Sequence, residues 1–260
     1  MIGRLANFLG SGRREPTPQT IEVRHAGESF GVEVRRSPTA RRLILRVRGA
    51  TRDAVLTIPK RTSMADARSF AERQAAWLGA RLRWLPQAVH FEAGAIIPVR
   101  GTPTVIVSRP GERGVAWLDP SRNAPGAIQA LCVSGDPSHL PRRVVDFLRR
   151  EARRDLERAV AAAATQIGRK PPPLTLRDTA TRWGSCASSG RLNFSWRLVL
   201  APSFVLDYLA AHEVAHLVHM NHSPKYWALC RSLNADTNRA EAWLNAHGAD
   251  LHRYRLKKAG

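Results

Sequence analysis

Residues Ala211–Ser223 read AHEVAHLVHMNHS, and this stretch decides how the rest of the chain is interpreted. Within it, His212, Glu213 and His216 form the pattern H-E-x-x-H. Two histidines four residues apart lie one above the other on a helix, so both imidazoles can reach one metal ion. Glu213 lies beside that ion, where its carboxylate can take a proton from a bound water. The pattern therefore predicts a metal centre carried by a helix.

The residues around the motif predict that this helix is buried. It begins at Pro202 and Ser203, and its sequence SFVLDYLAAHEVAHLVHM is apolar on nearly every face, which is typical of a buried helix. Two histidines and a glutamate are costly to bury without partners, whereas a metal ion satisfies all three. We expect the helix to end near Met220.

A third protein ligand is expected, because a catalytic zinc usually has three and keeps one open position. The candidates are His219 and His222. On a continuing helix, His219 would lie about 10.5 Å along the axis from His212, too far for both to share an ion held at about 2 Å. Asn221 can end the helix, and Ser223–Pro224 is typical of the start of the next one. His222 then lies in a tight turn that can return to the metal, so we favour His222.

The composition describes a globular chain with an ambiguous charge. Of its 260 residues, 43% are hydrophobic, and no apolar run is long enough to cross a membrane. Three cysteines without C-x-x-C spacing favour a reducing compartment, so we expect a cytoplasmic protein. The 41 Lys and Arg outnumber the 21 Asp and Glu, for a net charge of +20. This charge is spread along the chain, whereas a nucleic-acid-binding footprint should be clustered, so we favour an Arg-biased composition and keep nucleic-acid binding as the alternative.

The sequence pattern divides the chain into a tail at 1–20, a strand-rich part at 21–135 and a helical, zinc-binding part at 136–260. The last two parts can be separate domains or one integrated domain. The tail is rich in Gly, Pro and Arg and is expected to be flexible.

One helix is predicted from Ser63 to Leu85, and a second helix, capped by Ser138, is predicted to end at Gly168. No internal repeat is visible. Strands are predicted in the runs TIEVRH, FGVEVRR, RLILRVR, AVLTIP, LTLR and RLNFSW and at 96–100, 104–108 and 127–133. LTLR and RLNFSW are expected to pair antiparallel if the loop between them turns back.

Three blocks resemble the YgjP-like (DUF45) family, which is grouped with the M48-type and SprT-like zinc metallopeptidases. They read RRSPTARRLILRVR (35–48), RWGSCASSGRLNFSWRLVLAP (182–202) and DYLAAHEVAHLVHMNHSPKYW (207–227). The resemblance implies an α+β, zincin-like metallopeptidase fold with one Zn²⁺ per chain. It also implies that His212, His216 and His222 are ligands and that Glu213 is the general acid and base. The expected substrates are peptides or proteins.

Several residues near the motif have open roles. Arg182 and Trp183 are candidate substrate-binding residues, Arg182 for a substrate carboxylate or the oxyanion, although a supporting role for both fits as well. Cys186 is more typical of a packed thiol than of a nucleophile. Tyr208 is four residues before His212 and is more typical of the core than of the site. Asp236 and Glu241 are unranked candidates to accept hydrogen bonds from the ligand imidazoles.

Together these patterns predict a zinc-dependent hydrolase, a metallopeptidase that cleaves peptide bonds with a zinc-activated water and Glu213 as general base. The alternative is a basic, nucleic-acid-associated protein. In that case zinc is structural, or a SprT-like protease acts on DNA-bound proteins. No membrane association is expected, and the oligomeric state is open.

Overall fold

The structure is a computed structural model that describes residues 19–49, 53–84, 87–119, 129–179 and 182–257. The chain divides into two compact units, Met1–Leu85 and Pro86–Gly260. The boundary expected between residues 135 and 136 falls inside the second unit, because the strands before it and the helices after it share one core. The expected tail lies outside the described residues, except that Gln19 and Thr20 already belong to the first strand.

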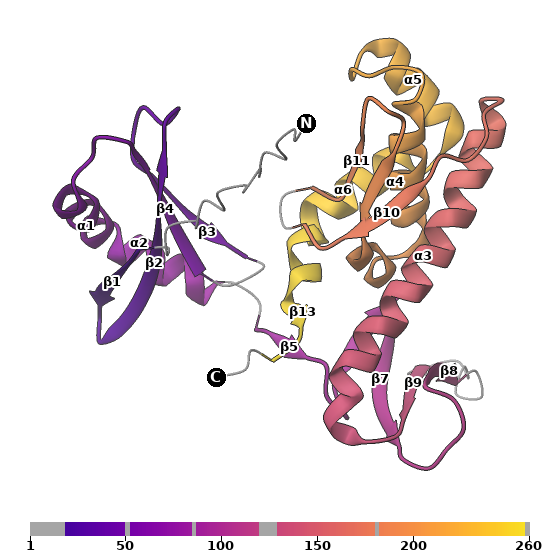
Figure 1. Ribbon diagram of the computed structural model, residues 1–260, viewed down its shortest axis with the longest axis horizontal. Coiled ribbons are helices and arrows are strands. Elements are labelled where there is room, and N and C mark those ends of the chain that lie inside the picture. The colour runs from indigo at the N-terminus through magenta and orange to yellow at the C-terminus, as the bar shows by residue number, and fades with distance from the viewer. Residues whose placement is uncertain (1–18, 50–52, 85–86, 120–128, 180–181, 258–260) are drawn as a thin grey trace, which may run out of the picture. The chain divides into compact units, whose positions relative to one another are not determined.

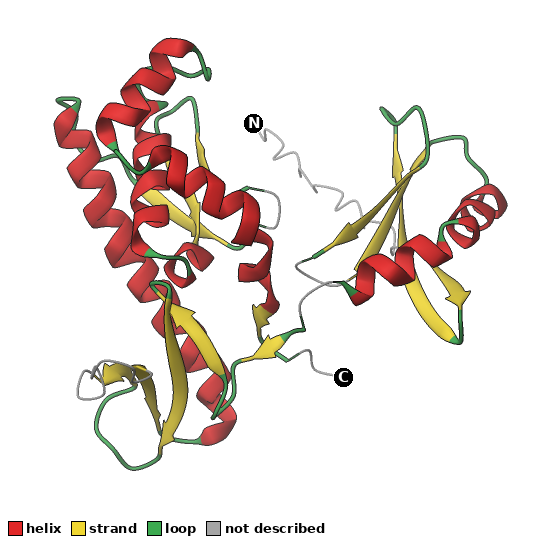
Figure 2. Cartoon of the chain, turned by 180° about the vertical axis from the view of Figure 1, so that it is seen from behind, coloured by secondary structure: helices red, strands yellow, loops and turns green. Residues whose placement is uncertain are grey.

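The first unit is a four-stranded sheet with two helices against one of its faces (Figures 1 and 2). Alternating residues such as Ile21 and Val23 point into the core between sheet and helices. The strand order is β1-β2-β4-β3, with β2 and β4 parallel and both outer pairs antiparallel. The elements are β1 Gln19–His25, β2 Glu28–Ser37, β3 Ile44–Arg48, β4 Asp53–Pro59, α1 Met64–Arg73 and α2 Ala75–Arg83.

The single helix predicted over residues 63–85 is two helices. Ser63 caps α1 by accepting a hydrogen bond from the Asp66 N–H, as its sequence indicates. The chain bends at Gln74, whose own N–H still reaches the carbonyls of the preceding turn. Both halves bury small or apolar side chains in the same core, so the bend keeps each helix against the sheet.

The second unit contains a sheet of the same topology as the first. Its order is β6-β7-β9-β8, again with a parallel central pair between antiparallel outer pairs. The first hairpin of each sheet turns through two residues with positive φ, Ala26–Gly27 and Arg100–Gly101, as a tight hairpin of this hand requires. The strands are β6 Ile96–Val99, β7 Thr102–Arg109, β8 Ala116–Asp119 and β9 Gln129–Ser134. The structure therefore contains a topological repeat that the sequence does not display.

A long helix connects this sheet to the rest of the unit. α3 (Leu140–Gln166) contacts β8 and β9 and then continues along β10 and α4 (Figure 1). Asp136, not Ser138, accepts the hydrogen bond that starts the 3₁₀ turn η2 (Pro137–His139) before it. Arg100 reaches α3 from the hairpin and donates to Glu151 and Asp155, each at 2.7 Å.

A three-stranded sheet lies on the other part of α3. It consists of β10 (Leu174–Arg177), β12 (Leu192–Ser195) and β11 (Gly184–Cys186), with β12 in the middle. β10 and β12 pair parallel, so the antiparallel pairing expected for LTLR and RLNFSW is wrong. The loop between them contains β11, which is antiparallel to β12, so the chain reverses twice before β12.

Three further helices complete the second unit. The 3₁₀ turn η3 (Trp196–Leu200) leads into α4, which contacts α3, α5, α6 and β11. The bounds are α4 Ser203–Ala215, α5 Pro224–Leu233 and α6 Thr237–His247. The 3₁₀ turn η4 (Gly248–Arg253) follows α6. After it, β13 (Tyr254–Arg255) pairs parallel with β5 (Val89–His90), the first strand of the unit. No helix in the described part of the chain is long and apolar enough to cross a bilayer.

Candidate metal centre

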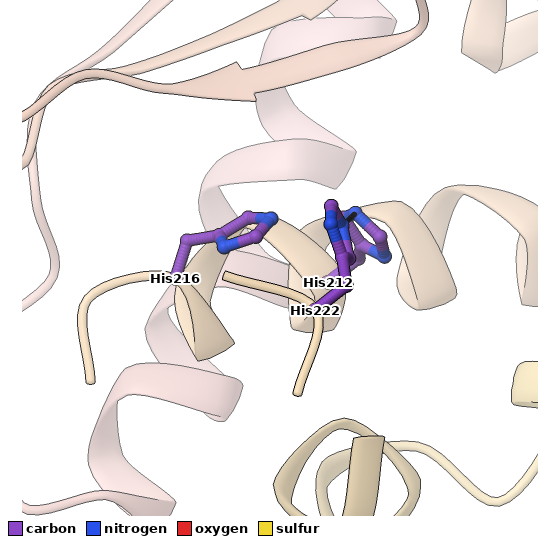
Figure 3. Close-up of side chains that lie close together, drawn as sticks. All are labelled: His212, His216 and His222. Atoms are coloured by element: carbon purple, nitrogen blue, oxygen red, sulfur yellow. Dashed lines mark hydrogen bonds between the residues drawn. The ribbon is translucent and has the colours of Figure 1, made fainter. Parts of the chain in front are cut away.

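The structure brings three histidine side chains together at the end of α4. His212 belongs to the helix, His216 is its C-cap residue, and His222 lies in the loop before α5. Figure 3 shows His216 pointing toward the other two rings. One nitrogen from each ring belongs to a set whose members all lie within 4.8 Å of one another. Among the described residues, this is the one group of His, Cys, Asp and Glu that could hold a metal ion.

The helix ends five residues earlier than predicted, at Ala215 rather than Met220. The chain then tightens, because the N–H groups of Leu217 and Val218 bond three residues back, to Val214 and Ala215. This turn leaves His219 outside the cluster and brings His222 into it. The start of α5 is as predicted, since Ser223 accepts a hydrogen bond from the Tyr226 N–H and Pro224 occupies the first turn.

The rings of His212 and His216 are oriented by hydrogen bonds at Nδ1, which leave Nε2 of each ring for the cluster. His216 Nδ1 lies 3.0 Å from the carbonyl oxygen of His219, which can only accept, so Nδ1 carries the proton and Nε2 keeps its lone pair. The Tyr208 hydroxyl lies 3.2 Å from His212 Nδ1 and donates to Glu241 Oε1 at 3.0 Å. His212 therefore donates from Nδ1 as well.

One pair of ring nitrogens has the spacing that a zinc ion requires. A tetrahedral zinc about 2.0–2.1 Å from its ligands holds them about 3.3–3.4 Å apart. His212 Nε2 and His222 Nε2 lie 3.3 Å apart. Burial also lowers the pKa of the His212 ring to about 4, so the ring is neutral at physiological pH, as a metal ligand must be.

Two aromatic residues of α5 support the cluster. Tyr226 is fully buried, stacks on His216 with ring centres 4.5 Å apart, and donates its hydroxyl to the carbonyl of His212 at 3.1 Å. Trp227 lies against His222, with ring centres 5.6 Å apart. The first turn of α5 therefore supports both the helix end and the loop ligand.

Glu213 lies on the same helix turn with its side chain buried. The residue is 4% exposed, and burial raises the pKa of its carboxyl to about 7, against the opposing effect of the Arg182 guanidinium. A carboxyl with a pKa near neutrality can both accept and release a proton at physiological pH. Gly184 of β11 lies directly against this carboxyl, because a Cβ on it would be 2.9 Å from Glu213 Cγ and Cδ.

The remaining candidates have the following positions. Arg182 is exposed just before β11, and Trp183 stacks on His252 with ring centres 5.1 Å apart. Cys186 faces Glu213, and burial and that carboxylate both raise the pKa of its thiol, so the group is a neutral thiol rather than a nucleophilic thiolate. Tyr208 contacts His212 at Nδ1, whereas His222 lies at the other ring nitrogen, Nε2. Tyr208 lies behind His212 and connects the ring to Glu241, while Asp236 pairs with Arg239.

One comparison with known proteins assigns a family. The model of the YgjP-like metallopeptidase domain matches residues 41–247, which contain the three histidines and Glu213. The chain belongs to the YgjP-like metallopeptidase family. The match begins in the first unit and ends in α6, so the YgjP-like domain includes parts of both units. No curated protein and no solved structure matches the chain.

Removing the Tyr208 hydroxyl should weaken zinc binding without removing a ligand. In Tyr208→Phe, His212 Nδ1 loses its acceptor, and the loss of such a partner typically costs about 10–100-fold in metal affinity. Competition with a chromophoric chelator measures the change. Tyr254→Phe loses the same hydroxyl elsewhere in the unit and should bind zinc as the wild type does. Equal affinities for Tyr208→Phe and wild type would contradict the orienting role.

Adding one methyl group at Gly184 should impair catalysis while zinc binding persists. The Cβ in Gly184→Ala would displace the Glu213 carboxyl, and a shift of about 1 Å at a reacting group can cost about a hundredfold in rate. We expect peptide hydrolysis to fall by about that factor at unchanged zinc content. Gly31→Ala in β2, where the added Cβ would make only an ordinary contact of 3.6 Å with Thr20, is the control. A fully active Gly184→Ala would show that Glu213 does not need this space.

Proposed function

We propose that the protein is a zinc-dependent peptidase with a zincin-like arrangement, in which His212, His216 and His222 hold the ion. The observation that carries this proposal is the convergence of three imidazole nitrogens on the same turn of α4 that buries the Glu213 carboxyl. Membership of a metallopeptidase family supports it. A structural zinc would not need the buried Glu213 carboxyl beside its ligands.

The residues around the proposed zinc site have separate roles in the reaction. A bound zinc supplies Lewis acidity, which polarises a carbonyl and makes water more acidic. Glu213 accepts the proton of the attacking water and passes it to the leaving amine. The Tyr208–Glu241 pair keeps His212 in the tautomer that binds metal. Tyr226 and Trp227 hold His222 in its loop.

The edge of the small sheet supplies a place for an extended peptide. β11 is an edge strand, it contacts α4, and Gly184 within it touches Glu213. A peptide that adds to β11 by backbone pairing would pass beside the general base. This mode needs no particular side chain, so it fits a peptide substrate of either orientation.

The alternative, a nucleic-acid-associated protein, rests on the net charge of +20. Phosphate contacts predict binding that weakens steeply as the salt concentration rises. A mobility-shift series from low to physiological salt tests nucleic-acid binding. An absence of binding even at low salt would show that the charge reflects only an Arg-rich composition.

Zinc dependence of peptide hydrolysis tests the proposed function. We expect the purified full chain to cleave members of a mixed quenched-peptide library when loaded with one zinc per chain. Activity should disappear on treatment with a chelator and return on addition of zinc. A zinc-loaded protein that cleaves no member of the library would overturn the proposal.

A further inference from the structure

A cavity of about 380 Å³ lies where β10 ends and β11 begins, and the proposed function gives it no role. The polar and aromatic residues that line it come from the ends of both strands, from the loop between them and from β12. They are Arg177, Thr179, Arg182, Trp183, Ser185 and Asn193. The volume lies at the low end of the range of about 300–1,000 Å³ for small-molecule sites, so it can hold one amino-acid side chain or one chain terminus.

The lining favours an anion. It holds two guanidinium groups, an amide and hydroxyl groups, and no carboxylate. Within the described residues, neither Arg177 nor Arg182 has a carboxylate oxygen within ion-pair distance. The nearest acid in the sequence, Asp178, is held instead by Arg197, which donates to its two oxygens at 2.6 and 3.2 Å. Both guanidinium groups are therefore available to a ligand, and a planar guanidinium matches a carboxylate in geometry.

The cavity is built on fixed groups. Trp183 is stacked on His252 and lies beside Gly248 of η4. Arg197 also donates to the carbonyls of Leu251 and Tyr254, so the start of the loop after β10 is tied to the end of the chain. Thr179 donates to the carbonyl of Arg182 at 2.7 Å, which joins the two sides of the loop.

The cavity adjoins the place where a peptide would lie on β11. Successive residues of a strand point to opposite faces, so Gly184 faces Glu213 whereas Ser185 faces the other side, where Asn193 donates to it at 3.4 Å. A peptide paired with β11 alternates in the same way, so one of its side chains, or its end, would point to the face of the cavity. Gly184 is also one of the residues that line the cavity, and it lies against the Glu213 carboxyl, so the cavity is close to the general base.

We propose that this cavity binds a carboxylate of the substrate, held by Arg177 and Arg182, and that the enzyme prefers peptides with an acidic residue or a free C-terminus near the cleaved bond. This inference rests on the proposed function. The carboxylate has two possible sources, the side chain of Glu or Asp and the chain terminus. Both present the same planar anion to the two guanidinium groups.

Matched peptides test the preference. The set pairs each Glu-containing peptide with its Gln counterpart, and each free C-terminus with its amide. Binding is measured with zinc-loaded Glu213→Gln protein, which should bind peptides without cleaving them. We expect one carboxylate source to bind at least tenfold more tightly than its neutral counterpart. Arg177→Gln and Arg182→Gln, each made in the Glu213→Gln protein, should abolish this difference, while Arg191→Gln, a matched charge loss outside the cavity, should retain it.

The outcomes separate this inference from the proposed function. Equal binding of acidic and neutral peptides would overturn the carboxylate site, even if the wild type cleaves them. A carboxylate preference that both cavity variants remove would support the site, even if zinc-loaded wild type cleaved nothing and the proposed function failed. If Arg182→Gln in the otherwise wild-type enzyme lowers kcat equally for all peptides and keeps the preference, Arg182 acts on the reacting carbonyl and the carboxylate assignment is wrong for it.

Discussion

Glu213→Gln should lower peptide hydrolysis by about a thousandfold while zinc stays bound, because a positioned general base contributes about 10²–10⁴-fold. Gln has nearly the shape of Glu and keeps a carbonyl oxygen, but it cannot accept the proton of the attacking water. Glu213 is not one of the three grouped histidines, so the ligand set is unchanged. Its side chain is buried against Gly184, where the isosteric Gln fits the same space.

The measurement compares kcat and zinc content in the same preparations. The control is Glu157→Gln, which removes an exposed carboxylate that pairs with Arg153 on α3, and it should leave both quantities unchanged. A Glu213→Gln protein with normal zinc and normal kcat would remove the general-base role. A protein that loses zinc as well would show that Glu213 helps to hold the metal.

His222→Ala should lower zinc affinity by more than about a hundredfold, a larger loss than that expected for a partner behind a ligand. The substitution removes one of three ligands. Among the described residues, the group that could hold the ion contains no fourth His, Cys, Asp or Glu to replace it. We expect about one zinc per wild-type chain after dialysis and little in the variant, as measured by mass spectrometry of metal content. Activity should fall in proportion to the zinc that remains.

His219→Ala is the matched control for that experiment. The His219 side chain lies outside the cluster, and its backbone carbonyl, which the substitution keeps, accepts the hydrogen bond from His216. We therefore expect His219→Ala to retain its zinc. Loss of zinc from His219→Ala, with retention in His222→Ala, would reverse the assignment of the third ligand.

Local patterns in the sequence predicted the core of the candidate site. The four-residue spacing of His212 and His216 puts both rings on one side of a helix regardless of the surrounding fold. Ser223 and Pro224 mark the start of α5, so the chain has to turn before them, and His222 lies in that turn. The predicted helix end was five residues late, because the sequence contains no Gly or Pro to mark the tight turn after Ala215.

The partners of these residues come from distant parts of the chain. Glu241 meets Tyr208 only because α6 packs on α4, and the sequence alone left Glu241 and Asp236 unranked. Gly184 is an ordinary loop glycine by pattern, and its need to lack a side chain follows from the Glu213 carboxyl that lies against it. No local spacing encodes such contacts, because each depends on how two separate elements pack.

The sequence by itself determined which residues could hold a metal, since helical periodicity and capping act over a few residues. The tertiary structure decided the rest: the unit boundary after Leu85, the parallel pairing of β10 with β12, the repeated four-strand topology and the cavity between Arg177 and Arg182. Strand pairing and side-chain packing join residues that are far apart in the chain, so their outcome is set by the free energy of the whole folded unit rather than by any short stretch.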